Sequence, residues 1–459
     1  MKVRKKLRCV KGKLREWNPL QRVAQTRFCI RFCRTGKMCK ENPFPLLILL
    51  TLGYRLLLDV LYIKVLSPAY SYVWMTVDIV PLQYLCSWLA VIVLSPFIAE
   101  LNLRTSASSI IVTLLNFIYF IPMTAYCGCK GTTNSLLLVS VIYWTLLLLW
   151  QFRIPVLRLA PVSARYASVM YSLLTVFSAL LILFVSGRYT GFRVTFQLRE
   201  VYEIRSEAAG YAIPGIFNYA LSTMSVVLAV LLMYWLVKKK YLISLGIIVV
   251  FWLYYSISAT KSIFMLLFLA LGCVFFFRPW MYSWISGLAS LGVIASVLEK
   301  KLLGSDQLLF MAFYRVMMLP AQLAENAADF FGTHPLNLFR DGILGKFSFD
   351  SIYSAKIQNV LGEQSCYPES FANVGLVGDL YVNLPILLGL VLMPLVIVLC
   401  LRLLDLVSQD TMPKLLFAVC VYFAYQFSNM SWSTVLLTAG FILACLLLYF
   451  FPKEEVPHL

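Results

Sequence analysis

Charged residues, acids and histidine are all scarce in this sequence. Only 13% of its 459 residues are charged, and it contains 21 Asp and Glu residues and two His residues. Soluble globular domains average about 25% charged residues, so this composition excludes an ordinary soluble protein. Twelve cysteines are present, but no two of them have CxxC spacing. This scatter, together with the scarcity of histidine, argues against a zinc site.

Hydrophobic residues, in contrast, make up 61% of the chain and form runs too long for a globular core. Apolar runs of about twenty residues predict transmembrane helices. We therefore expect an all-α fold, a polytopic integral membrane bundle of about twelve transmembrane helices with both chain ends on one side. The expected spans lie at about 45–66, 80–100, 107–126, 134–152, 167–187, 214–237, 241–258, 262–277, 280–298, 383–404, 414–430 and 433–451.

The distribution of basic residues predicts the orientation of this bundle. The net charge is +18, and residues 1–42 hold 14 Lys and Arg but only two Glu. We interpret 1–42 as a basic cytoplasmic tail attracted to anionic lipids, with a nucleic-acid-binding arm as the less favoured alternative. The expected inner loops carry ten Lys and Arg residues, whereas the short outer loops carry three. By the positive-inside rule, both ends are cytoplasmic.

Two expected outer segments are much longer than tight turns, namely the third outer loop at 188–213 and the fifth outer loop at 299–382. The fifth loop contains nine of the 21 acids and is rich in Phe, Tyr, Leu and Ile rather than in disorder-promoting residues. Long connections in compact proteins are often functional. Within the transmembrane domain at 43–459, we expect both loops to contain short helices and to form the functional site.

The third outer loop carries several arginines on a predicted helix. Residues 194–209 lack Pro and Gly, and their spacing predicts an amphipathic helix. Arg205 falls on its apolar face without an acid at i±4, whereas Arg199 has Glu203 at i+4. Because a guanidinium binds phosphate oxygens bidentately, we favour Arg205, helped by Arg199, as a diphosphate ligand. The alternative is a membrane-surface helix whose arginines contact lipid phosphates.

The fifth outer loop supplies further candidates in the segments FYRVMMLP, FRDGILG and YPESFANVGLVGDLYVNLP. These candidates are Tyr314, Arg315, Arg340, Glu369, Asn373, Asp379 and Tyr381. Structural roles remain open for them, because Arg315 and Arg340 could pair with neighbouring acids and Asp379 could cap a helix. His334, beside a proline, is predicted to be an exposed turn residue rather than a base.

Three charged residues lie outside the two long loops. Arg55 and Asp59 stand one turn apart in the first span, which favours a structural ion pair over a proton relay. Lys261, in the turn between the seventh and eighth spans, has no such partner and is expected to face outward, where it could join a positive outer cavity.

The combination of twelve spans, a third loop containing YEIRSEA, an SATKS turn and a fifth loop ending FANVGLVGDLYVNLP resembles the Wzy-type O-antigen and capsule oligosaccharide repeat-unit polymerases. The resemblance covers roughly residues 45–450 and rests mostly on topology. The sequence departs from the family pattern at Lys261, where relatives often have Arg, and at Asn383, Leu384 and Pro385, where they have Asn-Phe-Gly.

This resemblance implies a multi-pass membrane glycosyltransferase with an active site that faces outward from the cell (plasma or inner) membrane. Such an enzyme cleaves the bond between a growing glycan and undecaprenyl diphosphate and transfers the glycan to a second lipid-linked repeat unit. The product would be an O-antigen, capsule or exopolysaccharide. We expect Arg205 and Arg315 to hold the donor diphosphate. Asp379 or Glu369 would orient or deprotonate the acceptor hydroxyl.

The remaining substrate-binding candidates are Arg199, Arg340, Lys261, Tyr314, Asn373 and Tyr381. No DxD-like signature occurs in the outer loops, so we expect neither a metal nor another cofactor. The expected partners are membrane lipids and the lipid-linked donor and acceptor, with a flippase and a chain-length regulator as candidate protein partners and no nucleic acid. Two rival functions stay open. One is a transporter or flippase of lipid-linked oligosaccharide, and the other is an O-antigen-ligase-like transferase.

Overall fold

The fold is helical throughout the part of the chain that the structure describes. The computed structural model describes residues 43–132, 134–157, 159, 162–194, 201–342, 350–365 and 370–451, and it contains no strand in these ranges. The expected all-α class is therefore confirmed for these residues. The basic tail at 1–42 lies outside them.

A helix, or a stack of consecutive helical segments, occupies each of the expected spans. These are α4 (Phe44–Leu61) with η1 (Tyr62–Leu66), α6 (Pro81–Asn102), α7 (Ala107–Leu115) with η3 (Asn116–Phe120) and α8 (Ile121–Lys130), α9 (Leu136–Arg153), α10 (Ala164–Val185) with η4 (Ser186–Thr190), α12 (Gly215–Val237), α13 (Tyr241–Ser258), α14 (Lys261–Phe276), α15 (Ile285–Leu303), α19 (Ile386–Val407), α20 (Pro413–Asn429), and α21 (Trp432–Leu437) with α22 (Phe441–Tyr449).

Shorter helices form the connections. These are α5 (Ser67–Tyr70), η2 (Ser71–Val73), α11 (Val201–Ala209), η5 (Pro279–Tyr282), η6 (Leu309–Met318), α16 (Leu319–Phe331), α17 (Ile357–Glu363) and α18 (Gly375–Asn383). Among the described residues, nine helical segments are long and apolar enough to cross a membrane, which supports a helical membrane protein. The segments α14, α15 and α20 are not among these nine, so the number twelve stays a prediction.

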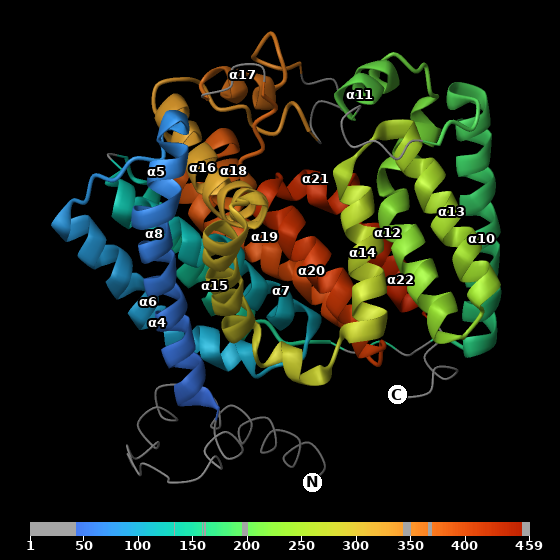
Figure 1. The fold of residues 1–459 in the computed structure, drawn as a ribbon, viewed down its shortest axis with the longest axis horizontal. Helices are drawn as coiled ribbons and strands as arrows, with labels where there is room; N and C mark the ends of the chain where they lie inside the picture. Colours follow the sequence, from blue (N-terminus) through green and yellow to red (C-terminus); the bar gives the residue numbers. More distant parts are fainter. Residues whose placement is uncertain are drawn as a thin grey trace, which may run out of the picture.

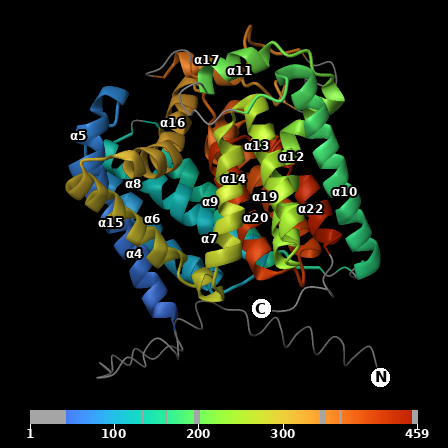
Figure 2. The same ribbon diagram turned by 45° about the vertical axis from the view of Figure 1, so that its right-hand side comes forward.

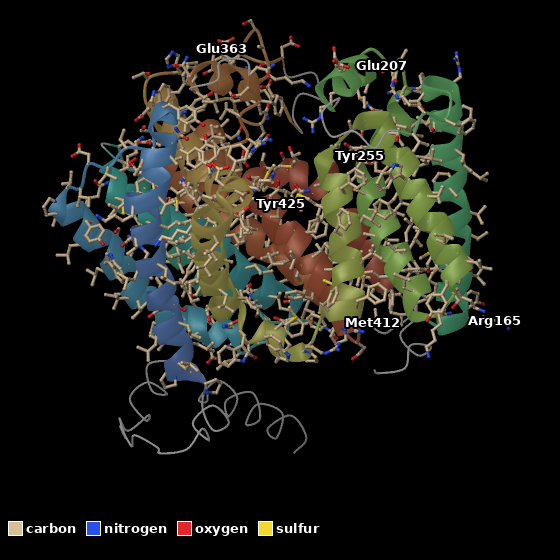
Figure 3. The ribbon with its side chains drawn as sticks, viewed as in Figure 1. Arg165, Glu207, Tyr255, Glu363, Met412 and Tyr425 are labelled. Atoms are coloured by element: carbon tan, nitrogen blue, oxygen red, sulfur yellow. The ribbon has the colours of Figure 1, made fainter. Side chains whose placement is uncertain are left out.

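The helices of the two long loops lie at the same end of the bundle. Figure 1 and Figure 2 show α11 of the third loop and α17 of the fifth loop at the top of the molecule. In Figure 3, Glu207 and Glu363 lie at this end, whereas Arg165 and Met412 lie at the opposite end. This arrangement brings the two loops together over one mouth of the bundle.

Two loop boundaries differ from the sequence-based expectation. The helix predicted over 194–209 is described only in part: Val194 is not helical, α11 covers Val201–Ala209, and residues 195–200 lie outside the described residues. The chain turns just before this point, where Gly191 adopts the left-handed conformation with φ 57°. The start of the fifth loop is also later than expected, since α15 continues to Leu303 and ends at Gly304 with φ 64°.

Prolines account for three of the wide, π-helical turns in the bundle. Each of η1, η3 and η6 ends two residues before a proline, namely Pro68, Pro122 and Pro320. A proline lacks the N–H that an α-helix needs, and its ring clashes with the carbonyl four residues earlier. The residue before each proline instead donates to the carbonyl five residues back, as Leu319 does to Tyr314.

The predicted pair in the first span forms and is buried in a polar network. Arg55 makes an ion pair with Asp59, and both side chains are almost fully buried. Asp59 also accepts hydrogen bonds from the Tyr84 hydroxyl (2.8 Å) and the Trp88 indole (2.9 Å). Arg55 donates to Ser87 Oγ at 2.9 Å. Each charge therefore has a partner of opposite sign within the protein, which confirms the structural pair.

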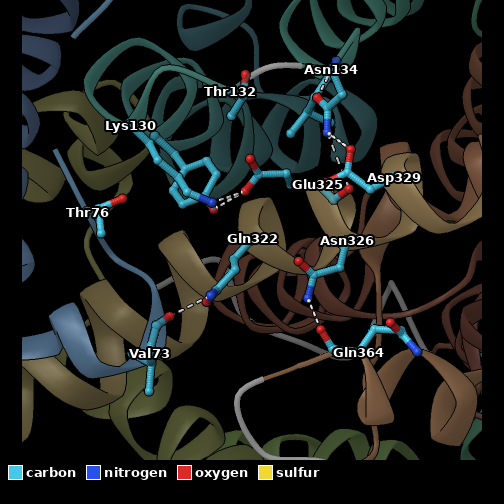
Figure 4. A network of polar contacts seen from close by, with 12 residues as sticks. Val73, Thr76, Lys130, Thr132, Asn134, Gln322, Glu325, Asn326, Asp329 and Gln364 are labelled. Atoms are coloured by element: carbon cyan, nitrogen blue, oxygen red, sulfur yellow. Dashed lines mark hydrogen bonds and ion pairs between the residues drawn. The ribbon is translucent and has the colours of Figure 1, made fainter. Parts of the chain in front are cut away.

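Polar contacts also anchor α16, the central helix of the fifth loop (Figure 4). Glu325 forms an ion pair with Lys130 of α8 and accepts a hydrogen bond from the Tyr126 hydroxyl at 2.5 Å. One turn earlier and later, Gln322 Nε2 donates to the Val73 carbonyl at 2.6 Å and Asp329 accepts from Asn134 at 3.0 Å. These contacts fix the fifth loop on the bundle.

Candidate functional site

A cavity of about 410 Å³ lies between the third and fifth loops. Its walls come from α11, the start of α14, η6, the start of α16, residues 371 and 373, and the end of α20. Among the described residues that line it, Arg205 and Arg315 are the only charged ones. The sequence-based prediction paired these two arginines, and the structure places them in one cavity.

Arg205 reaches the cavity from α11, which packs on the bundle through its neighbour. Ile204 is 4% exposed, whereas Arg205 is exposed, so the expectation that Arg205 lies on the buried apolar face is wrong. Of the two acids nearest to it in sequence, Glu203 and Glu207, the second is already engaged. Glu207 pairs with Arg193 (2.6 Å) and accepts from the Tyr211 hydroxyl (2.7 Å). No ion pair of Arg205 occurs in the described part of the chain, and a guanidinium that lines a cavity is a suitable ligand for a phosphate anion.

The ion pair beside Arg205 also shifts the protonation of both partners. The hydrogen bond from Arg193 lowers the pKa of the Glu207 carboxyl, and the same bond raises the pKa of the Arg193 guanidinium. Both groups therefore stay charged near neutral pH. This pair ties residue 193, before the undescribed segment 195–200, to the end of α11, and it holds the two ends of the third loop together.

Arg315 reaches the cavity from the wide helix η6. Its guanidinium lies over the Phe310 ring at 5.6 Å from the centroid, and no ion pair of Arg315 occurs among the described residues. Tyr314, the preceding residue, is buried and stacks on Tyr70 with ring centroids 4.8 Å apart. Tyr314 therefore fixes η6 to α5 and does not line the cavity, while Arg315 projects from the other side of the helix.

Asn373 connects this cavity to a smaller one of about 50 Å³ in which Asp379 lies. Asp379 is 1% exposed, and its carboxylate accepts from Ser431 Oγ (2.9 Å) and from the backbone N–H of Trp432 (3.1 Å). It therefore caps the start of α21. The structural role that the sequence left open for Asp379 is present, and Asp379 is absent from the lining of the arginine cavity.

Burial also sets the protonation of Asp379, which belongs to α18 outside the nine long apolar helices. Desolvation raises the pKa of the Asp379 carboxyl to about 7, although its hydrogen bonds with Ser431, Trp432 and Asn383 act in the opposite direction. Asn383 Nδ2 donates to this carboxylate at 2.8 Å. A carboxyl with this pKa can exchange a proton near neutral pH.

The other predicted site residues lie elsewhere or outside the described residues. Tyr381 is hydrogen-bonded to Ser135 Oγ at 2.9 Å and does not line the arginine cavity. Arg340 donates to the Asp350 carbonyl at 3.5 Å, also away from that cavity. Lys261 begins α14, and its neighbours Thr260 and Ser262 line the cavity. Arg199 and Glu369 fall outside the described residues.

The prediction that His334 is an exposed turn residue is confirmed, whereas the absence of a role as a base stays a prediction. His334 is exposed and stacks on Phe330 with ring centroids 3.9 Å apart. No group of three or more His, Cys, Asp or Glu side chains that could hold a metal ion occurs among the residues that the structure describes.

Sequence reasoning missed the contribution of α20 to the cavity. Tyr425, Gln426 and Asn429 line it, and Figure 3 shows Tyr425 between the two ends of the molecule. All three belong to a stretch interpreted only as an apolar span. Amides spaced within one turn of an otherwise apolar helix are unusual in a lipid-facing position, and this pattern was the available signal.

Arg205, Arg315 and Asn373 thus line a single cavity to which both long loops contribute. Comparisons with known proteins found no matching family model, no matching curated protein and no matching solved structure.

Proposed function

We propose that this protein is a membrane glycosyltransferase that joins undecaprenyl-diphosphate-linked oligosaccharide repeat units into a surface polysaccharide. The observation that carries this proposal is the cavity that Arg205 and Arg315 line together, without a carboxylate partner for either among the described residues. Two guanidiniums facing one space suit a diphosphate, because each can hold two phosphate oxygens.

The chemistry follows from the charge that develops during transfer. The acceptor hydroxyl oxygen forms a bond with the anomeric carbon of the donor glycan while the bond from that carbon to the diphosphate oxygen breaks. The electron pair of the broken bond stays on the diphosphate, and the hydroxyl proton leaves to a carboxylate or to water. Fixed positive charge at Arg205 and Arg315 stabilises this leaving group more strongly in the transition state than in the ground state.

The proposal includes the remaining features inferred from sequence. The chain has twelve spans, both of its ends are cytoplasmic, and the arginine cavity opens outward near the membrane surface. Lipid-linked donor and acceptor reach it from the bilayer, and a flippase and a chain-length regulator act beside it. The transfer needs no metal, since the two arginines supply the positive charge that a metal ion would otherwise bring to the leaving diphosphate.

The proposal is tested by deleting the gene in its native host and analysing the surface glycan and the lipid-linked pool. We expect single repeat units to accumulate on the outer face while long polymer is lost. Repeat units trapped on the inner face would instead identify a flippase. Polymer retained on its lipid carrier would identify a ligase.

Complementation then assigns the activity to the cavity. Arg205→Ala and Arg315→Ala should each fail to restore polymer at normal protein levels in the membrane. Arg188→Ala is the matched control, because Arg188 is exposed on η4 in the same loop but does not line the cavity. Normal polymer in both cavity variants would contradict the proposed function.

A further inference from the structure

A second cavity of about 340 Å³ adjoins the arginine cavity. The two cavities share four lining residues, namely Thr260, Ser262, Gln426 and Met430. The second cavity extends from this shared wall between the outer ends of α12 and α13 toward α21. A molecule that occupies one cavity therefore lies against a molecule, or a part of the same molecule, in the other.

The chemical character of the second cavity differs from that of the first. None of the described residues that line it is charged. Its walls carry hydroxyls and amides, including those of Asn218, Ser222, Ser225 and Thr438, together with tyrosine rings such as Tyr422. Hydroxyl and amide groups can donate to and accept from a polyol, and aromatic rings can stack on the C–H face of a sugar. This lining matches an uncharged sugar rather than an anion.

Gln426, on the shared wall, has a buried side-chain atom without a hydrogen-bond partner. Its side chain is 2% exposed, and its amide oxygen Oε1 is buried without a hydrogen-bond partner. A buried polar atom without a partner costs free energy, and among the eighteen such atoms found in the described residues only Gln426 Oε1 belongs to a residue that lines either cavity. A ligand hydroxyl that donates to Oε1 would satisfy this atom.

We infer that the second cavity binds a neutral sugar unit and that Gln426 accepts a hydrogen bond from one of its hydroxyls. This inference rests on the proposed function, because it places the glycan beside the diphosphate held by Arg205 and Arg315. The sugar belongs either to the donor, joined directly to the diphosphate, or to the acceptor. In both cases the cavity contacts the hydroxyls of an uncharged sugar ring, and Gln426 is a specificity residue for that ring.

The test measures binding to the purified full chain in lipid nanodiscs. The sugar probes are the methyl glycosides of glucose, galactose, N-acetylglucosamine and glucuronic acid, observed by saturation-transfer NMR. We expect at least one neutral glycoside to bind more tightly than the glucuronide. Gln426→Leu, which keeps the size of the side chain but removes the acceptor, should weaken this binding about tenfold. Arg315→Ala should leave it unchanged.

A second variant keeps the inference testable if Gln426→Leu does not fold. Ser222→Phe fills the second cavity from α12, and Ser222 does not line the first cavity. This variant should abolish glycoside binding while the protein still binds inorganic diphosphate in calorimetry. Equal binding of neutral and acidic glycosides by the wild-type protein, or unchanged glycoside binding in both variants, would overturn the inference.

Two further arms separate the possible outcomes. A hexose 1-phosphate should bind more tightly than the methyl hexoside if the sugar belongs to the donor, because its phosphate then reaches Arg205 and Arg315. Independent binding of the methyl hexoside and inorganic diphosphate, with no gain for the hexose 1-phosphate, assigns the sugar to the acceptor. A wild-type protein that does not bind inorganic diphosphate would contradict the proposed function and not this inference. That measurement does not depend on Gln426→Leu or Ser222→Phe.

Discussion

Arg205 of α11 and Arg315 of η6 line the same cavity, although they belong to different loops of the chain. Each is held by a different device. The Arg193–Glu207 pair closes the third loop behind Arg205, while the stack of Tyr314 on Tyr70 fixes the helix that carries Arg315. The cavity therefore depends on contacts remote from its own lining, and these contacts can be tested separately.

The first prediction concerns the side of the membrane on which the cavity opens. Ser206 on α11 and Arg165 at the start of α10 are both exposed, and Figure 3 shows Arg165 and Glu207, the residue after Ser206, at opposite ends of the molecule. A membrane-impermeant maleimide added to intact cells should label Ser206→Cys and should label Arg165→Cys only after permeabilisation. The unsubstituted chain gives the background from its native cysteines. The reverse labelling pattern would show that the cavity faces the cytoplasm and would contradict the proposed topology.

The second prediction concerns the loop-closing ion pair. Glu207→Gln removes the charge that holds Arg193, so α11 should lose its fixed position and polymer should fall severalfold in a complementation assay. The melting temperature should change little, because the Arg193 and Glu207 side chains are 34% and 47% exposed and such solvent-accessible pairs contribute little to stability. The charge-swapped double variant Arg193→Glu with Glu207→Arg should restore part of the polymer. Full activity of Glu207→Gln would show that the pair does not position Arg205.

The third prediction concerns the proline after η6. Pro320→Ala restores a backbone N–H, which can bond the Val316 carbonyl and return η6 to α-helical geometry. Arg315 would then rotate away from its present position, and transfer should slow by up to about 100-fold. Pro122→Ala is the matched control, since Pro122 follows the wide helix η3 and does not line the cavity. Equal amounts of polymer from the two variants would show that the π-helical geometry of η6 does not position Arg315.

The fourth prediction concerns pH and the buried cap Asp379. Burial raises the pKa of its carboxyl from 3.8 to about 7. The folded state therefore binds this proton more tightly than the unfolded state does, so the associated stability is fully present below about pH 4 and is lost as the pH rises through about 7. The size of this effect is roughly 4 kcal/mol at most.

Thermal unfolding measured from pH 4.5 to 8 tests this prediction. Asp379→Asn should flatten the pH dependence in this window, because the amide does not titrate. Asp350→Asn serves as the control, since Asp350 is an exposed acid of the same loop. A profile for Asp379→Asn that keeps the full slope of the unsubstituted protein would show that another group titrates there.

The sequence predicted the helical class and the positions of the long helices because long apolar runs leave few alternatives. It also predicted the Arg55–Asp59 pair, since both partners stand on one helix. Arg205 and Arg315 were predicted as phosphate ligands from the chemistry of the guanidinium group alone, and that prediction needed no knowledge of the fold.

The rest of the site depends on contacts between distant segments. Nothing in local spacing shows that Glu207 pairs with Arg193 or that Asp379 caps α21, because these partners meet only after the bundle has formed. The amides of α20 were overlooked because a hydropathy reading averages a polar face into its apolar surroundings. Adjacent residues on a helix face different directions, so Tyr314 and Arg315 could not both be expected to line the cavity. The sequence alone did not show which of the two would do so.

The most direct test of the central claim is glycan transfer by the purified chain in proteoliposomes that contain lipid-linked repeat units. The wild-type protein should lengthen the glycan and release undecaprenyl diphosphate. Arg205→Ala and Arg315→Ala should each slow this release by about 100-fold or more, whereas Arg188→Ala should retain the wild-type rate. Wild-type release by both cavity variants would contradict the claim that these two arginines hold the diphosphate.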